Sequence, residues 1–457
     1  METMLETVNP AAGEIIQRYQ TISLPAAIKM VDAVEQAFQS WRELPLAQRC
    51  NLARQLAPLL RERKQAYAVL MAKEMGKPLA QGIAEIEKCA LLCLHYAEQS
   101  GNYLATRIIQ SDKQKSYVLH EPLGVVLGIM PWNYPFWQVF RYAVPALLAG
   151  NGILLKHAPI STGTALEIEK LFLDAGFPAD IFRALIITNE TAAEVMAHPH
   201  VSAVTFTGSV AAGRMIAATA GKALKKTVLE LGGCDAYLIL DDADLELAAE
   251  ACVTSRMLNA GQSCIAAKRL IVVDAIREEF SALVSQKMQR YHLGDPLNEN
   301  TTCGPLARKD IRDDVHAKVL RSIKGGAKLV MGGNIPALPG FFYPPTLLVN
   351  VSSNTPAYQE EIFGPVIAII PAANEDEAIK IANSTSFGLG AAVFTKDIAR
   401  GELIAAQKLR AGTCVVNMFV ASDPRLPFGG IKNSGYGREL SQEGMLSFVN
   451  IKTVVIS

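Results

Sequence analysis

Residues 24–110 show the apolar spacing of long amphipathic helices. In the segments AAIKMVDAVEQAFQSW and QRCNLARQLAPLLRERKQAYAVLMAKEMG, apolar side chains recur three and four positions apart. That period puts them on one face of a helix, which can then be buried against other elements. Gly76 and Pro78 follow the second segment and are typical of a helix end. This part of the chain is therefore predicted to be helical.

The pattern changes at residue 124. From there short apolar runs, typical of buried strands, alternate with segments of helical period. The runs are GVVLGIM, GILLK, AVTFTGS, TVLELGG, AYLIL and RLIVV, and a second series continues through GTCVVN. Continuous apolar strands separated by helices indicate parallel sheets that are covered on both faces. We therefore predict an α/β fold with two open α/β domains in series.

Two extended pieces are left over from those domains. The segment RIIQSDKQKSYVLHEPLG contains two strand-like stretches around a polar turn, and TVVIS resembles a short strand. The predicted division is one domain from 1–104 and 124–231, a second from 232–433, and a small β arm from 105–123 and 434–457. Exposed strand edges in such an arm favour pairing with a neighbouring subunit, so we expect a homodimer or homotetramer.

Length and charge narrow the class of protein. The chain has 457 residues, half of them apolar, and 44 basic residues balance 44 acidic ones. Two or three domains are expected at this length. Zero net charge argues against nucleic acid or an anionic membrane surface as the main partner. No apolar stretch approaches the roughly 18 residues that a membrane span requires.

The eight cysteines do not form a recognisable framework. Most are isolated at irregular spacings, which matches neither a disulfide scaffold nor a Cys-x-x-Cys zinc site, so no metal is predicted. We interpret Cys89, Cys93 and Cys234 as packing residues. Free thiols are typical of a reducing compartment, and the N-terminus lacks the features of a secretion signal. A cytoplasmic location is expected.

Polar residues at the predicted strand ends are candidates for chemistry, because open α/β sheets bind ligands there. Asn133, in PWNYP, can donate its amide N–H to a developing oxyanion, or it can be a turn asparagine. Lys156 ends the next strand and can hold a ribose or phosphate, or be a solvated charge. His157 beside it is interpreted as structural.

Two further stretches end apolar strands. In TFTGSVAAGRM, Gly208 and Ser209 precede a helix predicted to start at Gly213, whose free N–H groups would suit a pyrophosphate. The alternative is an ordinary serine N-cap. In LELGGCD, Glu230 is either a general base or the partner of a lysine such as Lys225 or Lys226.

Cys264, in LNAGQSCIAAK, has two interpretations. A free thiol usually packs as a small hydrophobe, which is the common role of cysteine. A thiolate is also the best side-chain nucleophile near neutral pH.

Taken together, these motifs resemble one family. PWNYP, FTGS, LELGGCD, GQSC and EEIFGPV occur in the order and approximate spacing of the aldehyde dehydrogenase superfamily. The resemblance extends from VNPAAGEII to PFGGIKNSGYGRE and FVNIKTV, essentially the whole chain. It implies a Rossmann-like cofactor domain at 1–104 and 124–231, a catalytic domain at 232–433, and an oligomerisation arm.

The resemblance also implies catalytic roles. Cys264 would attack the aldehyde carbon, and Asn133 with the backbone N–H of Cys264 would stabilise the oxyanion. After hydride transfer to a nicotinamide, Glu230 would activate the water that hydrolyses the thioester. Relatives that pass the acyl group to coenzyme A often lack this glutamate, so Glu230 favours hydrolysis.

NAD or NADP is the cofactor that the resemblance implies. Lys156 would bind the adenosine ribose, and Glu361 and Phe363 the nicotinamide ribose. Family members that prefer NAD often carry a glutamate three residues after the lysine, where this chain has Pro159, so NADP is equally open. The residues expected at the cofactor site are Ile129, Trp132, Lys156, Pro159, Gly208, Ser209, Gly213, Leu231, Glu361 and Phe363.

Three segments resemble the succinate-semialdehyde dehydrogenase branch of this family: PWNYPFWQVFR, LLKHAP and SDPRLPFGG. There Trp137, Arg141 and Ser422 would contact substrate. Arg141 would clamp a carboxylate, or alternatively pair with a structural carboxylate. Some members carry a second cysteine beside the nucleophile as a redox switch; Ile265 and Ala266 follow here, so none is predicted in this loop.

Two other functions compete with this one. A broader aliphatic or ω-carboxy aldehyde dehydrogenase, acting for example on glutarate semialdehyde, would use the same catalytic residues. A catalytically silent binding protein on the same scaffold would be expected to lack some of Cys264, Glu230 and Asn133, and all three are present.

Overall fold

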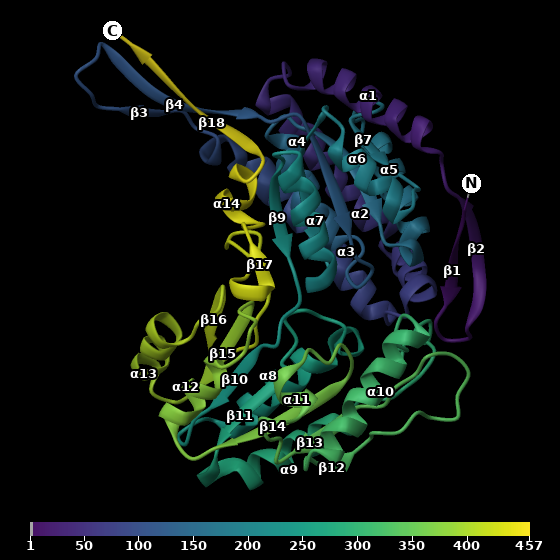
Figure 1. Cartoon of the computed structure of the whole chain (residues 1–457), viewed down its shortest axis with the longest axis vertical. Coiled ribbons are helices and arrows are strands. Elements are labelled where there is room, and N and C mark those ends of the chain that lie inside the picture. The colour runs from purple at the N-terminus through teal and green to yellow at the C-terminus, as the bar shows by residue number, and fades with distance from the viewer. Residues whose placement is uncertain (1–2) are drawn as a thin grey trace.

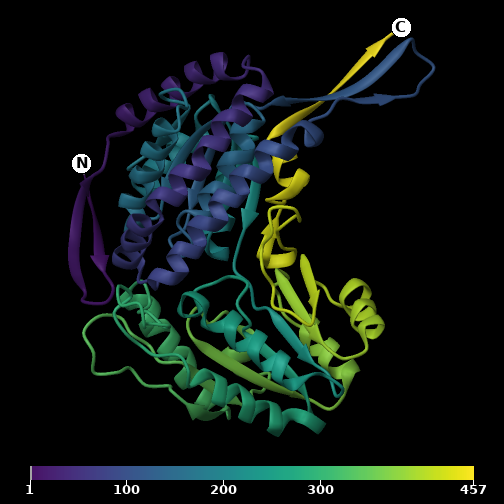
Figure 2. The same ribbon diagram turned by 180° about the vertical axis from the view of Figure 1, so that it is seen from behind.

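The protein is described by a computed structural model covering residues 3–457; residues 1 and 2 of the expected first domain lie outside the described residues. The predicted α/β fold is confirmed. Figures 1 and 2 show two lobes, each built on its own twisted sheet, and an arm that projects from the first lobe.

The first lobe contains a six-stranded sheet whose strands are parallel except for its first edge strand. In spatial order the strands are β17 (Gly435–Tyr436), β9 (Lys226–Glu230), β8 (Val201–Thr207), β5 (Val125–Met130), β6 (Gly152–His157) and β7 (Phe182–Ala184). The helices of this lobe are α1 (Leu24–Trp41), α2 (Leu46–Met75), α3 (Leu79–Tyr103), α4 (Trp137–Leu148), α5 (Thr162–Asp174), α6 (Asn189–Ala197) and α7 (Val210–Lys222).

Alternating side chains of the central strands supply two separate hydrophobic cores. Along β5, Val125 and Leu127 face a core shared with α1, α6 and α7, whereas Val126 and Met130 face the core built with α2, α3, α4 and α5. Both faces of the sheet are therefore covered, which explains why its strands read as continuous apolar runs.

The helix predicted to end near Gly76 does so. Gly76 adopts a left-handed conformation (φ 82°) at the end of α2, and a Cβ there would lie 2.8 Å from Pro305 of the second lobe. A side chain would disturb both the turn and the contact between lobes.

An N-terminal hairpin was not predicted. Strands β1 (Met4–Asn9) and β2 (Glu14–Gln20) pair antiparallel across a turn that contains Gly13. Nearly all of β2 is exposed, so it lacks the alternation of apolar and polar residues that identifies a half-buried strand.

The second lobe contains a seven-stranded sheet with the same two-sided burial. Leu238 of β10 faces the core formed with α10 and α12, and Tyr237 and Ile239 face the core formed with α8 and α9. The strand order is β12 (Lys328–Met331), β13 (Thr346–Val349), β14 (Val366–Ala372), β11 (Arg269–Val273), β10 (Ala236–Ile239), β15 (Gly390–Phe394) and β16 (Thr413–Val416). The helices are α8 (Leu245–Met257), α9 (Arg277–Met288), α10 (Lys309–Lys324), α11 (Pro356–Gln359), α12 (Glu375–Asn383) and α13 (Ile398–Leu403).

The arm is a three-stranded antiparallel sheet. Strand β4 (Lys115–Pro122) lies between β3 (Arg107–Ile109) and β18 (Val449–Ile456), so the hairpin and the C-terminal strand belong to one unit (Figure 1). Residues 434–457 do not all belong to it, however. Strand β17 pairs with β9 of the first lobe, and α14 (Ser441–Leu446) packs on α3 and α4. The sequence placed this segment in the arm because its two-residue strand is too short to show a period.

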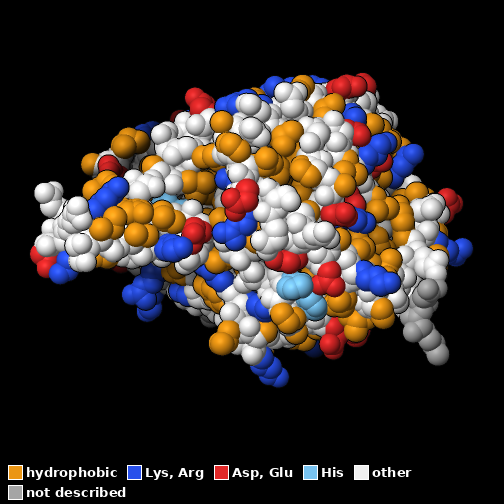
Figure 3. All heavy atoms as spheres, turned by 90° about the horizontal axis from the view of Figure 1, so that it is seen from above, with side chains coloured by type: hydrophobic (Ala, Val, Ile, Leu, Met, Phe, Trp, Pro, Cys, Tyr) orange, Lys and Arg blue, Asp and Glu red, His pale blue; other side chains and the backbone are white. Residues whose placement is uncertain are grey.

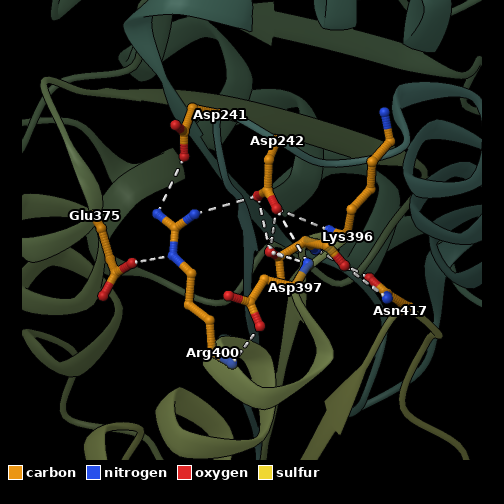
Figure 4. A network of polar contacts seen from close by, with 8 residues as sticks. Asp241, Asp242, Glu375, Lys396, Asp397, Arg400 and Asn417 are labelled. Carbon is orange, nitrogen blue, oxygen red and sulfur yellow. Dashed lines mark hydrogen bonds and ion pairs between the residues drawn. The ribbon is translucent and has the colours of Figure 1, made fainter.

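A polar network fastens α13 to the second sheet (Figure 4). The Asp242 carboxylate accepts hydrogen bonds from the Thr395 hydroxyl at 2.8 Å and from the backbone N–H groups of Lys396 and Asp397 at 3.0 and 3.1 Å. Arg400 bridges Asp242, Asp241 and Glu375. These bonds keep the pKa of Asp242 below its usual value even though partial burial opposes ionisation.

Among residues 3–457, no helix is both long and apolar enough to cross a membrane. On the face seen in Figure 3, basic and acidic side chains are interspersed with apolar ones, in keeping with the neutral net charge.

Candidate active site

Asn133 follows β5 and is held in a fixed orientation. Its amide nitrogen donates to the carbonyl oxygen of Gln262 at 3.0 Å, and its oxygen accepts from the Gln138 amide at 3.0 Å. The side chain is buried. Because an amide nitrogen carries two hydrogens, these contacts leave one N–H of Asn133 available to a ligand.

Glu230 ends β9 and has no hydrogen-bonding partner within residues 3–457 for either carboxylate oxygen. The lysines proposed as its structural partners point elsewhere: Lys225 donates to the carbonyl of His198, and Lys226 to that of Leu446. Burial raises the pKa of Glu230 well above its usual value, and the nearby Glu439 raises it further. A buried carboxyl group without partners is costly to stability, which points to a functional role.

The loop that carries Cys264 has an unusual backbone. Asn259, Ala260 and Gly261 have φ angles of 54°, 51° and 73°, all in the left-handed region. A Cβ on Gly261 would lie 2.2 Å from the carbonyl oxygen of Gly364. The Lys268 ammonium donates hydrogen bonds to the carbonyl oxygens of Ser263 and Cys264 in this loop, at 2.9 and 2.5 Å. These hydrogen bonds hold the loop in place. Strained backbone of this kind is common at active sites.

Cys264 is one of two thiols that are not fully buried. All eight cysteines are free, and six are buried; Cys264 and Cys414 are partly exposed. Burial raises the pKa of the Cys264 thiol to about 12, while Lys268 and Arg141 oppose that shift. The thiol is thus protonated at neutral pH and requires a base before it can act as a nucleophile.

Cys264 lines two cavities. The first, of about 370 Å³, is bounded by the predicted substrate residues Trp137, Arg141 and Ser422 together with Phe419. The Trp137 indole N–H donates to the Ser422 hydroxyl at 3.1 Å. Helix α4 starts at Trp137, and the Glu85 carboxylate accepts from the backbone N–H groups of Phe136 and Trp137 at 2.9 Å each. Glu85 thereby provides hydrogen-bond acceptors for the first backbone N–H groups of α4 and fixes the position of the helix that carries Trp137 and Arg141.

Arg141 lines this cavity and has a carboxylate of the protein beside it. Its guanidinium lies 2.6 Å from the Glu439 carboxylate, and both side chains are buried. Arg141 Nε and Nη2 make no hydrogen bond within residues 3–457, and the residue lines the cavity, so the ion pair with Glu439 leaves both interpretations of Arg141 in place.

The second cavity that Cys264 lines has a volume of about 330 Å³. Of the ten predicted cofactor residues, six line it: Trp132, Gly208, Ser209, Leu231, Glu361 and Phe363. The rings of Trp132 and Phe363 meet edge to face with their centroids 5.9 Å apart. Asn133 lines this cavity as well, so it borders the same space as the thiol.

Helix α7 begins earlier than predicted. It starts at Val210, with Ser209 as N-cap accepting from the Ala212 N–H at 3.3 Å, so Gly213 lies in the first turn rather than at the start. Gly213 is buried, and a Cβ there would lie 2.5 Å from Leu231, which explains the small residue. Gly208 and the N-cap Ser209 line the cavity, so the N-terminus of α7 lies at its edge.

The remaining predicted cofactor residues lie at neighbouring strand ends. Ile129 of β5 is directly paired with Lys156 of β6, and Pro159 opens a short 3₁₀ turn beyond β6. None of the three is part of the lining of the second cavity. Burial lowers the pKa of Lys156. His157 contacts the carbonyl oxygen of Pro135 at 3.0 Å, as expected for a structural histidine.

Several residues of the site were not found from the sequence. Gln138 lines both cavities and holds Asn133; Lys88 lines the first cavity and Lys318 the second. Glu439 lies within the segment PFGGIKNSGYGRE, so the resemblance pointed to its region but not to its role. Lys88 could not be recognised from the sequence, because its segment EIEKCA has the pattern of an ordinary helix.

Comparison with known proteins identifies the family. The sequence profile described as the aldehyde dehydrogenase family matches residues 1–454. The chain belongs to the aldehyde dehydrogenase family. The cavities on either side of Cys264 are thus those of an aldehyde dehydrogenase fold.

Relatives of known description are similar over the whole length. A probable succinate-semialdehyde dehydrogenase (NADP+) of Synechocystis sp. is 46% identical over 99% of this chain and 100% of its own length. A succinate semialdehyde dehydrogenase (NAD(P)+) of Escherichia coli is 42% identical, with 98% of this chain and 97% of the relative covered.

Solved structures agree with the fold. The succinic semialdehyde dehydrogenase from Streptococcus pyogenes in complex with NADP+ superposes with a TM-score of 0.97 at 36% identity, covering 99% of each chain. The structure of Gox0499, studied for cofactor and substrate selection, gives a TM-score of 0.98 at 39% identity over 99% of this chain and 100% of that one.

Proposed function

We propose that this aldehyde dehydrogenase oxidises succinate semialdehyde to succinate with NADP as the preferred cofactor. One observation carries the proposal: the Cys264 thiol lies where two cavities meet, one lined by Trp137 and Ser422 and the other by Trp132 and Glu361. Such a thiol can contact an aldehyde from one side and a nicotinamide from the other.

The second cavity fits a nicotinamide dinucleotide. It combines an aromatic wall, the N-terminus of α7 and the carboxylate of Glu361, which suit a ring, a pyrophosphate and a ribose respectively. A Cβ on Gly208 would lie 2.5 Å from the Phe206 ring, and one on Gly232 would lie 2.4 Å from a carboxylate oxygen of Glu361, so a larger residue at either position would displace a side chain of this wall. When bound, the nicotinamide supplies the hydride acceptor.

Formation of the nucleophile requires a proton to leave the Cys264 sulfur. The raised pKa values of Cys264 and Glu230 both result mainly from burial, and the two groups interact electrostatically. Glu230, once ionised, can take the thiol proton directly or through a water molecule. The sulfur then bonds to the aldehyde carbon, and the carbonyl oxygen becomes an oxyanion.

The oxyanion needs donors already in place. The free N–H of Asn133 is one, and the backbone N–H of Cys264, which makes no hydrogen bond within residues 3–457, is the second. Donors held by other contacts need no reorganisation during the reaction, which is the source of their effect.

Hydrolysis completes the reaction. After hydride leaves the bound carbon, the substrate is a thioester on Cys264. Glu230 first releases the thiol proton to solvent and then accepts a proton from water. The water oxygen bonds to the acyl carbon, and the carbon–sulfur bond breaks to release succinate, with its proton lost to solvent, and the thiolate. A carboxylate without internal partners is free to make this contact with water.

The preference for NADP rests on Pro159. A carboxylate at this place would bind ribose hydroxyls and repel a 2′-phosphate, and proline does neither. The relatives named for NADP+ or NAD(P)+ support the same choice.

The test is the initial rate of nicotinamide reduction with succinate semialdehyde, measured side by side with NADP and NAD. We expect turnover with both and a higher kcat/KM with NADP. A Pro159→Glu variant should shift the ratio towards NAD. No turnover with either cofactor would overturn the proposal.

A broader aldehyde dehydrogenase is the second candidate. The pairing of Arg141 with Glu439 favours it, because a neutralised arginine gives less selectivity for carboxylates. Equal kcat/KM values for succinate semialdehyde and butanal would support this alternative.

We also propose that the arm joins subunits in a cytoplasmic homodimer or homotetramer. Its strands expose Ile108, Ile451 and Val455, each more than half accessible, on a sheet that projects into solvent. Light scattering should give a mass above one chain, and deletion of residues 449–457 should lower it. A monomeric full-length protein would contradict this.

A further inference from the structure

Lys268 is a buried lysine to which the proposed chemistry gives no role. It follows the thiol loop, residues 259–264, and its side chain is only 3% exposed. It lines neither of the two cavities that Cys264 lines. Its ammonium donates to the carbonyl oxygens of Ser263 and Cys264, at 2.9 and 2.5 Å. A positive charge is therefore held against the backbone of the residue that carries the thiol.

The third contact of Lys268 leads to the second cavity. Its ammonium lies 3.3 Å from Oε1 of Glu361, and the backbone N–H of Gly233 donates to the same oxygen at 3.2 Å. Oε2 of Glu361 makes no hydrogen bond within residues 3–457, and the side chain lines the cavity. An ammonium has three N–H donors, so these three oxygens use all of them. Lys268 thus joins the thiol loop to a carboxylate of the cofactor cavity.

A second buried lysine shows how unusual this arrangement is. Lys287 of α9 is also nearly buried, but its partners Glu246 and Glu250 are exposed carboxylates on the surface. A buried ammonium is costly unless an anion and hydrogen bonds compensate it. Within residues 3–457, the only ion pair of Lys268 is with Glu361. Loss of Lys268 would therefore leave a carboxylate of the cofactor cavity without its counter-ion.

The charge of Lys268 also acts on the thiol. Burial raises the pKa of Cys264, and Lys268 opposes this shift more strongly than Arg141 does, whereas Glu230 and Asp235 add to it. The ammonium contacts the carbonyl oxygen of Cys264, so the sulfur of the same residue is close to a cation that favours its ionised form. The titratable and charged groups that face the thiol are Tyr134 after β5, Arg141 of α4, Glu230 of β9, Asp235 before β10, and Lys268.

We propose that Lys268 is a positioning residue that holds the thiol loop against Glu361 and stabilises the thiolate of Cys264 once it forms. The inference deepens the proposed function and rests on its use of Cys264 as the nucleophile and of Glu361 at the cofactor ribose. Lys268 contacts neither substrate nor cofactor, and no proton moves to or from it.

The first test is the rate at which iodoacetamide alkylates Cys264, followed by mass analysis of its peptide without substrate or cofactor. Because the pKa of the thiol, about 12, lies above neutral pH, the rate follows the small thiolate fraction and rises with pH. Lys268→Met should lower the rate about 3- to 10-fold at each pH from neutral to mildly alkaline. This is the change for a pKa raised by roughly one unit, with a partly compensating rise in nucleophilicity.

Two further variants separate the charge of Lys268 from its hydrogen bonds. Lys268→Gln keeps an N–H donor without the charge, and it should lower the alkylation rate as Lys268→Met does. Lys268→Arg keeps the charge and should retain most of the wild-type rate. Lys287→Met removes a similarly buried lysine far along the chain and is the matched control. It should leave the alkylation rate unchanged, whatever its effect on stability.

The second test is the dissociation constant for NADP, measured by quenching of tryptophan fluorescence. Lys268→Met should raise it about 3- to 10-fold, because Glu361 loses the contact that orients it. In a Glu361→Gln background, Lys268→Met should have little further effect, since the partner is already changed. Additive losses in the double variant, or an unchanged constant in Lys268→Met, would overturn the link to Glu361 and with it the proposal.

The alkylation rate decides the other half of the proposal. Wild-type rates in both Lys268→Met and Lys268→Gln would overturn it, and so would faster alkylation, which is the result for a lysine that only restrains the loop. Neither test requires turnover. If the wild-type protein does not oxidise succinate semialdehyde, the proposed function fails, and these two measurements still judge the role of Lys268.

Discussion

Two carboxylates in this molecule have opposite environments. Asp242 in the second lobe receives hydrogen bonds from one hydroxyl, two backbone amides and an arginine, and the pKa of its carboxyl group is lowered (Figure 4). Glu230 at the end of β9 receives none from residues 3–457, and burial raises its pKa.

The two environments distinguish a carboxylate that stabilises the fold from one that is available to a ligand. A fully bonded carboxylate stabilises the fold and has no capacity left for a substrate. An unbonded buried carboxyl destabilises the fold, and its raised pKa makes it a better proton acceptor than an ordinary carboxylate. The two sites therefore respond in opposite ways to loss of charge: one loses stability, and the other loses activity.

The largest expected effect is at the thiol that Glu230 serves. Cys264→Ala should lower dehydrogenase activity by roughly four orders of magnitude or more, because no other group can form the covalent intermediate. NADP binding, followed by quenching of tryptophan fluorescence, should persist. Cys414→Ala removes the other partly exposed thiol and should retain activity.

The Glu230→Gln variant tests the role of the unbonded carboxylate. We expect kcat to fall about 100- to 10,000-fold, as for loss of a general base. Unfolding stability should be equal or higher at neutral pH. Because the pKa of Glu230 is raised above about 4.5, the wild type should lose stability relative to the variant as pH rises above that value. Denaturant titrations at several pH values measure this, and a variant that is less stable at pH 7 would contradict it.

Asn133→Ala should lower kcat about 100-fold, since one oxyanion donor is lost. The effect should appear in kcat more than in KM, because the donor acts mainly in the transition state. Loss of the Gln138 contact can disturb the loop as well, so Gln138→Ala is a useful comparison. If Gln138→Ala is as inactive as Asn133→Ala, the role of Asn133 is positional.

Asp242→Asn should have the smallest effect on catalysis. We expect a loss of ~2 kcal/mol in unfolding free energy and normal kcat. The pKa of Asp242 is lowered, so its stabilisation is present above the usual value near 3.8 and is lost as pH falls through the lower folded value. Lys396→Met is the control, because Lys396 contributes only its backbone N–H. An inactive Asp242→Asn enzyme of normal stability would contradict the structural role of Asp242.

The sequence was sufficient for features that have a period or a motif. The helices of residues 24–103 and the alternating strands after residue 124 follow from burial on fixed faces, and family motifs brought Cys264, Asn133 and Glu230 together. It was insufficient for β2, which is exposed and has no period, and for the start of α7, where Ser209 rather than Gly213 marks the boundary.

Partners across the fold were also beyond the sequence. Arg141 and Glu439 are 298 positions apart, and Lys88 and Ser422 meet from separate elements with no shared motif. Pairing of this kind depends on how α3, α4 and the C-terminal segment pack, which local patterns do not encode. Hence the sequence left both interpretations of Arg141 open and missed Lys88.

The central claim is that Cys264 carries the acyl group and Glu230 removes it. The most direct measurement is peptide mass analysis of Glu230→Gln after a single turnover with succinate semialdehyde and NADP. The account predicts a succinyl group on the peptide containing Cys264, formed together with one equivalent of NADPH and released slowly. An unmodified Cys264 after the same NADPH release, or a succinyl group on another residue, would contradict it.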